Sequence, residues 1–222
     1  MWIMITGGTQ IEDALNASGL GADALGLLVE PGQASESYFI SPEVATSITQ
    51  SLSPVCECVL VTHLIDVAEI VRLASIIGVK TIQLPGKVMP EDIVDIKNRL
   101  PSIKVIKSLH VVDDSCMEYV KKYIEIVDAI ELDTIDISTS RIGGTGRTHD
   151  WNISRKIVQE CKDKVPIILA GGLHSDNVED AIRTVKPSGV DVSSGVKDSE
   201  GVQDNKKLAL FVYKAKHVKS TY

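Results

Sequence analysis

Residues 165–196 read VPIILAGGLHSDNVEDAIRTVKPSGVDVSSGV, and this stretch contains two short apolar runs that each end in small residues. The first run, 165–170, is followed by two glycines, and the second, 190–193, is followed by Ser194 and Gly195. Short β-rich runs separated by a longer amphipathic stretch are typical of parallel strands joined by a helix. The stretch therefore predicts a strand–helix–strand unit.

The same alternation extends over the whole chain. Stretches with helical spacing, such as 70–78 and 117–127, lie between the apolar runs. Pro42 and Pro90 stand where the first turn of a helix tolerates proline. Eight strands are predicted: Trp2–Thr6, Ala22–Glu30, Val55–Thr62, Lys80–Leu84, Lys104–Ser108, Ala129–Asp133, Val165–Ala170 and Val190–Ser193.

The number of repeats predicts how the sheet closes. Dividing 222 residues by eight gives about 28 residues per unit, which fits a compact strand–loop–helix–loop repeat. We therefore predict an α/β fold, a (β/α)8 TIM barrel that forms a single domain over residues 1–222. The alternative is an open doubly wound sheet, but GGTQ at 7–10 does not match the dinucleotide pattern G-x-G-x-x-G.

Composition and charge narrow the possible partners. Hydrophobic residues make up 44% of the chain and charged residues 24%, which favours a folded globular protein. The net charge of −7, without a basic stripe, argues against nucleic acid as a partner. The apolar runs are far too short to span a membrane, the amino terminus lacks the basic flank of a signal peptide, and four cysteines make no dense disulfide framework. We expect a cytoplasmic protein with no membrane partner, and the oligomeric state stays open.

In a barrel of this kind, function resides where the strands end and in the loops that follow. The side chains or turns that reach this rim are mostly polar or glycine. They are Thr6, Glu30, Thr62 or His63, Gln83, Lys107 or Ser108, Asp133, Gly171 with Gly172, and Ser193 to Gly195.

The last two turns predict a phosphate site. Gly171, Gly172, Ser193, Ser194 and Gly195 leave backbone N–H groups open, and such groups bind anions without a basic side chain. The loops after strands seven and eight are a recurrent phosphate site in TIM barrels. The alternative is that the glycines only serve tight turns while the serines cap a helix.

Asp133 is the candidate acid, because it ends its strand and burial there would raise the pKa of its carboxyl group. Alternation places Glu131 on the same side, farther from the rim. The alternative role of Asp133 is a structural acceptor for loop N–H groups or a salt-bridge partner. The glycine-rich segment 143–151, GGTGRTHDW, is expected to form a loop over the mouth, with Thr148 or Asp150 as a helix cap.

Metal chemistry is not predicted. Cys56, Cys58 and His63 lie close together in sequence, but no second ligand pair follows at zinc-like spacing, so buried core thiols are expected. The other histidines show no catalytic spacing and are interpreted as surface or loop residues: His110, His149, His174 and His217. We expect neither a metal nor an organic cofactor.

Seven collinear segments together resemble one family. They are GADALGLLVEPG at 21–32, ISP at 40–42, IQLPG at 82–86, ELDT at 131–134, GGTGRTHDW at 143–151, LAGGLHSDNV at 169–178 and VDVSSGV at 190–196. In order and spacing they are similar to motifs of the phosphoribosylanthranilate isomerase family of tryptophan biosynthesis, over nearly the full chain.

The resemblance implies an Amadori rearrangement of N-(5-phosphoribosyl)anthranilate without metal or organic cofactor. An acid protonates the ring oxygen as the ribose opens, and a base then removes the C2 proton. By position, Asp133 is the acid and the five turn residues bind phosphate, while Gln83 and Gly144 are assigned to substrate binding. Thr6 stands where the family has its general-base cysteine, Tyr38 where it has an arginine for the anthranilate carboxylate, and Pro85 where it has a histidine.

A threonine hydroxyl supplies essentially no alkoxide at neutral pH, so Thr6 cannot replace the cysteine as a base. Two hypotheses follow from these departures. In the first, the chain is an isomerase in which Asp133 or a water held by Thr6 takes the proton. In the second, it is a diverged paralogue that binds another sugar phosphate, with weak or no isomerase activity.

Overall fold

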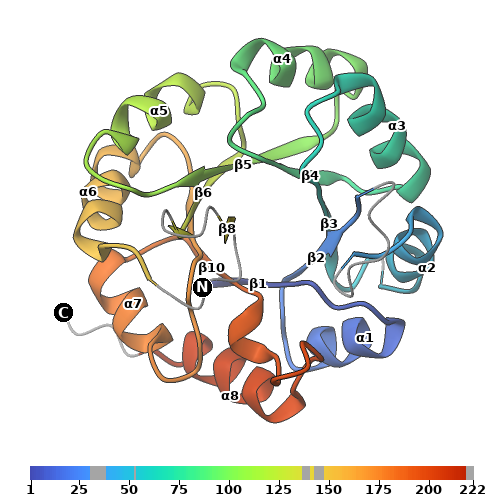
Figure 1. Cartoon of the computed structure of the whole chain (residues 1–222), viewed down its shortest axis with the longest axis vertical. Helices are drawn as coiled ribbons and strands as arrows, with labels where there is room; N and C mark the ends of the chain where they lie inside the picture. Colours follow the sequence, from blue (N-terminus) through green and yellow to red (C-terminus); the bar gives the residue numbers. More distant parts are fainter. Residues whose placement is uncertain (31–38, 53, 137–140, 143–147, 219–222) are drawn as a thin grey trace.

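Eight parallel strands close into a barrel in the computed structural model, which describes residues 1–30, 39–52, 54–136, 141–142 and 148–218. The strands pair in the order β1-β10-β9-β6-β5-β4-β3-β2 (Figure 1). Their bounds are β1 Trp2–Thr6, β2 Ala24–Leu28, β3 Glu57–Val61, β4 Thr81–Leu84, β5 Lys104–His110, β6 Ala129–Asp133, β9 Ile167–Leu169 and β10 Gly189–Val192. All eight predicted runs form barrel strands, which confirms the TIM barrel over the open sheet.

Helices surround the barrel in the order of the chain (Figure 1). Pro42 and Pro90 are the first residues of their helices, as predicted. Asp150 caps the sixth helix by accepting a hydrogen bond from the Asn152 backbone N–H at 2.9 Å. The helices are α1 Ile11–Gly19, α2 Pro42–Leu52, α3 Val67–Ile77, α4 Pro90–Arg99, α5 Cys116–Tyr123, α6 Trp151–Cys161, α7 Val178–Val185 and α8 Asn205–Lys216.

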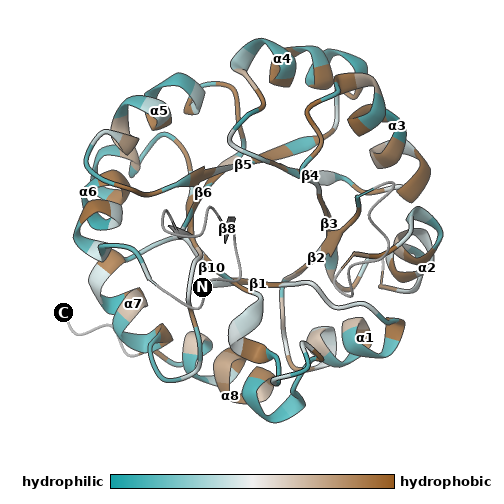
Figure 2. Ribbon diagram, viewed as in Figure 1, coloured by the Kyte–Doolittle hydropathy of each residue, from teal (hydrophilic) through white to brown (hydrophobic). Residues whose placement is uncertain are grey.

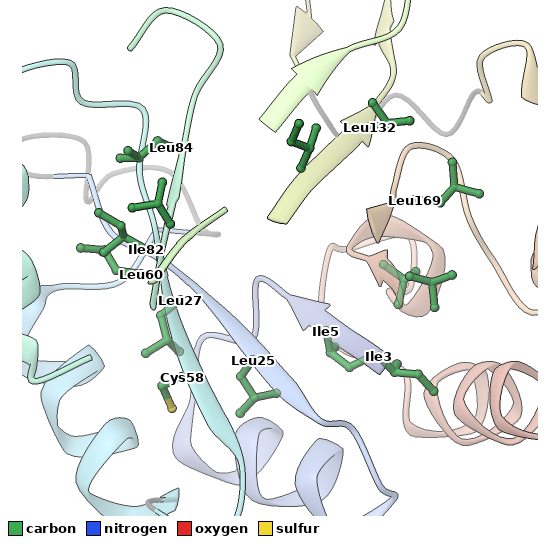
Figure 3. Packing of buried hydrophobic residues seen from close by; sticks show 14 of the residues in the cluster. Ile3, Ile5, Leu25, Leu27, Cys58, Leu60, Ile82, Leu84, Leu132 and Leu169 are labelled. Atoms are coloured by element: carbon green, nitrogen blue, oxygen red, sulfur yellow. The ribbon is translucent and has the colours of Figure 1, made fainter. Parts of the chain in front are cut away.

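Strand alternation divides the buried side chains into two clusters. Since successive side chains of a strand point to opposite faces, one set packs against the helices and the other fills the barrel. Figure 3 shows members of the outer set, which come from β1, β2, β3, β4, β6 and β9. The inner set consists of Met4, Ala24, Val59, Val61, Ile106, Ala129 and Ile168. The helices carry both hydrophobic and hydrophilic bands (Figure 2), as helices that cover a barrel require.

Three further observations concern the described part of the chain. A two-stranded antiparallel ribbon, β7 Ile135–Asp136 with β8 Arg141–Ile142, directly follows β6 and pairs Ile135 with Ile142. All four cysteines are free and buried, which confirms the prediction of core thiols for Cys56 and Cys58. Of the helices described, none is long and apolar enough to cross a membrane.

Candidate active site

A cavity of about 620 Å³ opens at the carboxyl ends of the barrel strands. The inner-face series of each strand continues into it, so that Thr6 follows Met4 and Asp133 follows Glu131 along their strands. The polar residues that line it are Thr6, Thr62, His63, Gln83, Ser108, His110, Glu131, Asp133, Asp191, Ser193, Ser194, Lys197, Asp198 and Ser199. Most of the predicted rim residues therefore meet in one cavity.

Three predicted rim residues lie elsewhere. The fully buried Lys107 occupies the outer face of β5, where its Nζ donates to the backbone oxygens of Pro85 and Val88 at 2.5 and 2.6 Å. Glu30 does not line the cavity and accepts hydrogen bonds from the Thr62 hydroxyl and the His63 N–H. Of the choices left open by the sequence, Thr62, His63 and Ser108 reach the cavity and Lys107 does not.

Gly195 is the third of these residues, and it lies behind the cavity wall. A Cβ atom on Gly195 would overlap the backbone oxygen of Leu173, so the turn after β10 packs directly on the turn after β9. Gly144 and Tyr38 lie outside the described residues.

The two predicted phosphate turns form one side of the cavity. Gly171 and Gly172 have φ angles of +83° and +65°, a left-handed conformation that favours glycine, so the turn geometry accounts for these two residues in part. Ser193 makes no side-chain cap to the short 3-10 helix η1, Ser194–Val196, which argues against a purely capping role. Within the described residues, the N–H groups of Gly171, Gly172, Ser193 and Ser194 donate to no other group. These donors are available to an anion.

A group of three carboxylic acids faces these turns from inside the barrel. Glu131 is the deepest, and its Oε1 accepts hydrogen bonds from Gln83 Nε2 at 3.0 Å and from the Ser108 hydroxyl at 3.1 Å. The other oxygen of Glu131 is buried without a partner among the described residues. Burial, and then the charges of Asp191 and Asp133, raise the pKa of Glu131 well above its ordinary value. Burial therefore favours the neutral form of Glu131.

Asp133 ends β6 and lines the cavity, as its position predicted. Burial raises the pKa of its carboxyl group, while the Thr134 N–H, which donates to Asp133 Oδ1 at 2.7 Å, and nearby His110 oppose that rise. Behind it, the Thr134 hydroxyl lies 2.9 Å from His149 Nδ1, and His149 Nε2 lies 2.6 Å from the Ser154 hydroxyl. Both ring nitrogens of His149 are thus engaged, which connects Thr134, beside Asp133, to Ser154 of α6.

The interpretation of the histidines was wrong for His110. It belongs to β5 and lines the cavity, and burial lowers its pKa. The signal was available, because His110 lies two residues after Ser108 and thus on the same strand face. His149 does lie in a loop, but it is half-buried and burial lowers its pKa to about 4.

Thr6 and Asp191 join β1 to β10 across the inside of the barrel. The Thr6 hydroxyl donates to Asp191 Oδ1 at 2.8 Å, and both residues line the cavity. Burial raises the pKa of Asp191 to about 7, with the Thr6 hydrogen bond opposing the rise and the charge of Asp133 adding to it. Gly26 leaves the space that Thr6 occupies, since a Cβ atom there would overlap the Thr6 side chain. Sequence reasoning missed Asp191, although alternation places it on the same face as Ser193.

Lys197 is the one lysine or arginine among the described residues that line this cavity. The Nζ of Lys197 lies 2.8 Å, and the Ser193 hydroxyl 3.4 Å, from the position that a Cβ atom of Gly7 would take, so the two groups are close neighbours. Burial lowers the pKa of Lys197. Across the described residues, no group of three His, Cys, Asp or Glu side chains could hold a metal ion.

The fold and the site together define a (β/α)8 barrel with acid–base side chains and unpaired backbone N–H donors at its mouth. Residues 3–214 match the family model described as N-(5'phosphoribosyl)anthranilate (PRA) isomerase. The chain is 42% identical to N-(5'-phosphoribosyl)anthranilate isomerase 2 of Methanosarcina mazei, over 98% of this chain and 95% of that protein. This chain belongs to the N-(5'-phosphoribosyl)anthranilate isomerase family.

Solved structures give the same result. The crystal structure of phosphoribosyl anthranilate isomerase from Thermotoga maritima has a TM-score of 0.83 at 34% identity, covering 97% of this chain and 98% of that one. A structure of the enzyme in complex with reduced 1-(o-carboxyphenylamino)-1-deoxyribulose 5-phosphate has a TM-score of 0.80 at 32% identity, with 97% and 98% covered. The family and the fold are therefore established by sequence and by structure.

Proposed function

We propose that this chain is a phosphoribosylanthranilate isomerase, which converts N-(5-phosphoribosyl)anthranilate into 1-(o-carboxyphenylamino)-1-deoxyribulose 5-phosphate in tryptophan biosynthesis. Membership of the family over residues 3–214 supports this activity. The observation that carries it is that unpaired N–H groups of two adjoining turns face a carboxylic acid across one cavity. A pentose phosphate carries its phosphate at one end and its reacting carbons at the other. The phosphate can therefore meet the N–H groups while the reacting carbons meet the carboxylic acid.

The phosphate group is assigned to the turns after β9 and β10. Gly171 and Gly172 offer backbone donors on one turn, and Ser193 and Ser194 offer them on the other. Lys197 adds a positive charge beside Ser193, which favours a dianionic phosphate. Binding of the phosphate end holds the ribose over the barrel axis. The acid and the sugar are then already in place, so proton transfer does not need a separate encounter between them.

Ring opening is assigned to Asp133. Its carboxyl group gives a proton to the ribose ring oxygen, the bond between C1 and that oxygen breaks, and the nitrogen lone pair forms the C=N bond of a Schiff base. A raised pKa suits this acid, because the group must still hold its proton near neutral pH. Gln83 holds Glu131 at the floor of the same cavity, and we assign it to the substrate side of the site.

Thr6 occupies the position that the family resemblance gives to the base, and this substitution is part of the proposal. A threonine hydroxyl stays protonated at neutral pH, so it cannot take the C2 proton itself. Its hydroxyl is already committed to Asp191. The proposed roles of Tyr38 and Gly144 concern residues outside the described chain, and Pro85 lines the cavity without a charge.

The test is direct. Purified protein mixed with N-(5-phosphoribosyl)anthranilate is expected to reduce the fluorescence of the anthranilate group, and the gene should rescue a tryptophan auxotroph that lacks the isomerase. Asp133→Asn should lower kcat by about 10²- to 10⁴-fold, as expected for loss of a general acid. Asp163→Asn is the matched control, because Asp163 is exposed at the opposite end of the barrel.

The competing hypothesis is a paralogue that binds another sugar phosphate. It predicts no fluorescence loss and no rescue, together with retained affinity for inorganic phosphate or a pentose phosphate in calorimetry. It also predicts that Thr6→Cys combined with Tyr38→Arg raises isomerase activity steeply from near zero. Turnover by the wild-type chain contradicts this alternative.

A further inference from the structure

The proposed reaction needs a base that Thr6 does not provide, and the cavity holds a second carboxylic acid to which no role has been given. Asp191 is 7% exposed, lines the cavity, and extends from β10 two residues before Ser193, where the proposed phosphate turn begins. A phosphate held at that turn places the ribose carbons beside the same strand end. Geometry therefore puts Asp191 within reach of the sugar.

Thr6 fixes the orientation of this carboxylate. Its hydroxyl donates to Oδ1 at 2.8 Å, which leaves Oδ2 as the oxygen not held by Thr6. Thr6 is itself 7% exposed and packs over Gly26, so its rotamer is constrained. A hydrogen bond from a neighbour in a fixed position is what orients a general base in proteins.

Besides Glu131 and Asp133, the described carboxylic acids that line the cavity are Asp191 and Asp198. Asp198 already accepts hydrogen bonds from the backbone N–H groups of its own loop, so Asp191 is the candidate acceptor. Burial favours the neutral form of Glu131, and Asp133 must hold a proton for ring opening, so the C2 proton needs another carboxylate as its acceptor. Like charges in one cavity make it costly to ionise both aspartates, which favours a state with one shared proton. Lys197 lies toward the phosphate turn, and His110 on β5 interacts with Asp133.

We propose that Asp191 is the catalytic base of this chain, and that Thr6 is the positioning residue that orients it. This inference rests on the proposed function and adds to it the group that takes the C2 proton. It differs from the two routes considered from sequence, in which Asp133 or a water on Thr6 takes that proton.

Every proton that Asp191 and Asp133 exchange with the sugar is accounted for in this scheme. After ring opening, Asp191 takes the proton from C2, the C–H electron pair forms the C1=C2 bond, and the C=N electron pair moves to the nitrogen of the Schiff base. The product of this step is an enolamine, with Asp133 ionised and Asp191 protonated. The 2-hydroxyl proton then returns to Asp133 and Asp191 gives its proton to C1, so the ketone forms and both residues regain their starting charge.

Asp191→Asn tests the base. It should lower kcat by at least 100-fold, while affinity for reduced 1-(o-carboxyphenylamino)-1-deoxyribulose 5-phosphate, measured by calorimetry, changes by less than about 5-fold. Deuterium at the ribose C2 should slow Asp191→Asn more than wild type, because the C2 step becomes rate-limiting. Asp133→Asn should show a smaller isotope effect than Asp191→Asn, because it slows ring opening instead. Retained ligand affinity also shows that Asp191→Asn is folded.

Thr6 variants test the positioning role. Thr6→Val keeps the shape and removes the hydroxyl, so the pKa of Asp191 should rise and the acid limb of the kcat/KM profile should move to higher pH. Thr6→Ser should restore the wild-type profile.

Each result decides between the claims. Asp191→Asn with wild-type kcat, or a Thr6→Val profile identical to that of wild type, overturns the inference and leaves the proposed function intact. A wild-type protein that never consumes the substrate contradicts both.

Discussion

Gly195 lies where the two turns of the proposed phosphate site touch. A methyl group at this position would overlap the backbone oxygen of Leu173 and crowd the Cα of His174, and neither backbone atom can rotate away. Gly195→Ala should therefore push the turns apart, lowering the free energy of unfolding by roughly 1–3 kcal/mol. Affinity for inorganic phosphate should fall as well, because donors on both turns are displaced. Urea unfolding and calorimetry measure the two effects.

Gly19→Ala is the matched control for this substitution. Gly19 ends α1, and a Cβ atom there would meet nothing within 4 Å. It should leave phosphate affinity unchanged and stability equal or slightly higher. If Gly195→Ala behaves like Gly19→Ala, the two turns do not depend on their close contact.

Some residues of the site could be predicted from the sequence and others could not. Asp133 was found because it ends an apolar run, and the structure places it in the cavity. Asp191 was missed because it lies inside a strand segment whose sequence is typical of core, where alternation alone decides which face meets the cavity. His110 was missed because the predicted strand ended at Ser108, whereas β5 continues to His110. The sequence could not decide whether Lys107 or Ser108 faces the cavity, because a shift of one residue along a strand exchanges its two faces.

Lys107 connects elements rather than the cavity. Its ammonium group, on the outer face of β5, donates to the backbone oxygens of Pro85 and Val88 and lies 4.7 Å from the centre of the Tyr123 ring. Lys107→Met should leave both oxygens without this donor and lower the free energy of unfolding by about 2–4 kcal/mol. Lys104→Met, on the exposed start of the same strand, should change stability by less than about 0.5 kcal/mol. Equal losses in the two variants would show that the connection between β4 and α4 does not need Lys107.

Elements were predictable where the pattern was repeated. The eight strands and the two proline-initiated helices follow from periodicity and from the restricted φ of proline. The ribbon β7–β8 was not predicted, because two-residue strands such as Ile135–Asp136 carry too few residues for an alternating pattern. Of the two helix caps predicted as alternatives for segment 143–151, Thr148 or Asp150, the structure has Asp150, and most of the loop before it lies outside the described residues.

At the scale of the whole molecule, the fold buries carboxylic acids in an interior that disfavours their charged forms. Closing eight strands buries three carboxylic acids inside one ring, and burial disfavours the charged form of each. The outer core between strands and helices supplies the stability that allows this arrangement. A site built in this way should make the fold less stable in the pH range where the acids ionise.

The raised pKa of Asp191 gives the size of this dependence of stability on pH. Its pKa is raised from 3.8 to about 7, so between these values the folded chain keeps a proton that the unfolded chain has lost. The free energy of unfolding therefore falls as pH rises from 4 to 7, by up to about 1.4 kcal/mol per pH unit for this group. Asp191→Asn cannot ionise and escapes this loss. Measured by urea unfolding at pH 4, 5.5, 7 and 8.5, its stability relative to wild type should increase up to pH 7 and then level off. A difference that stays constant with pH would mean that Asp191 ionises as easily in the folded chain as in the unfolded one.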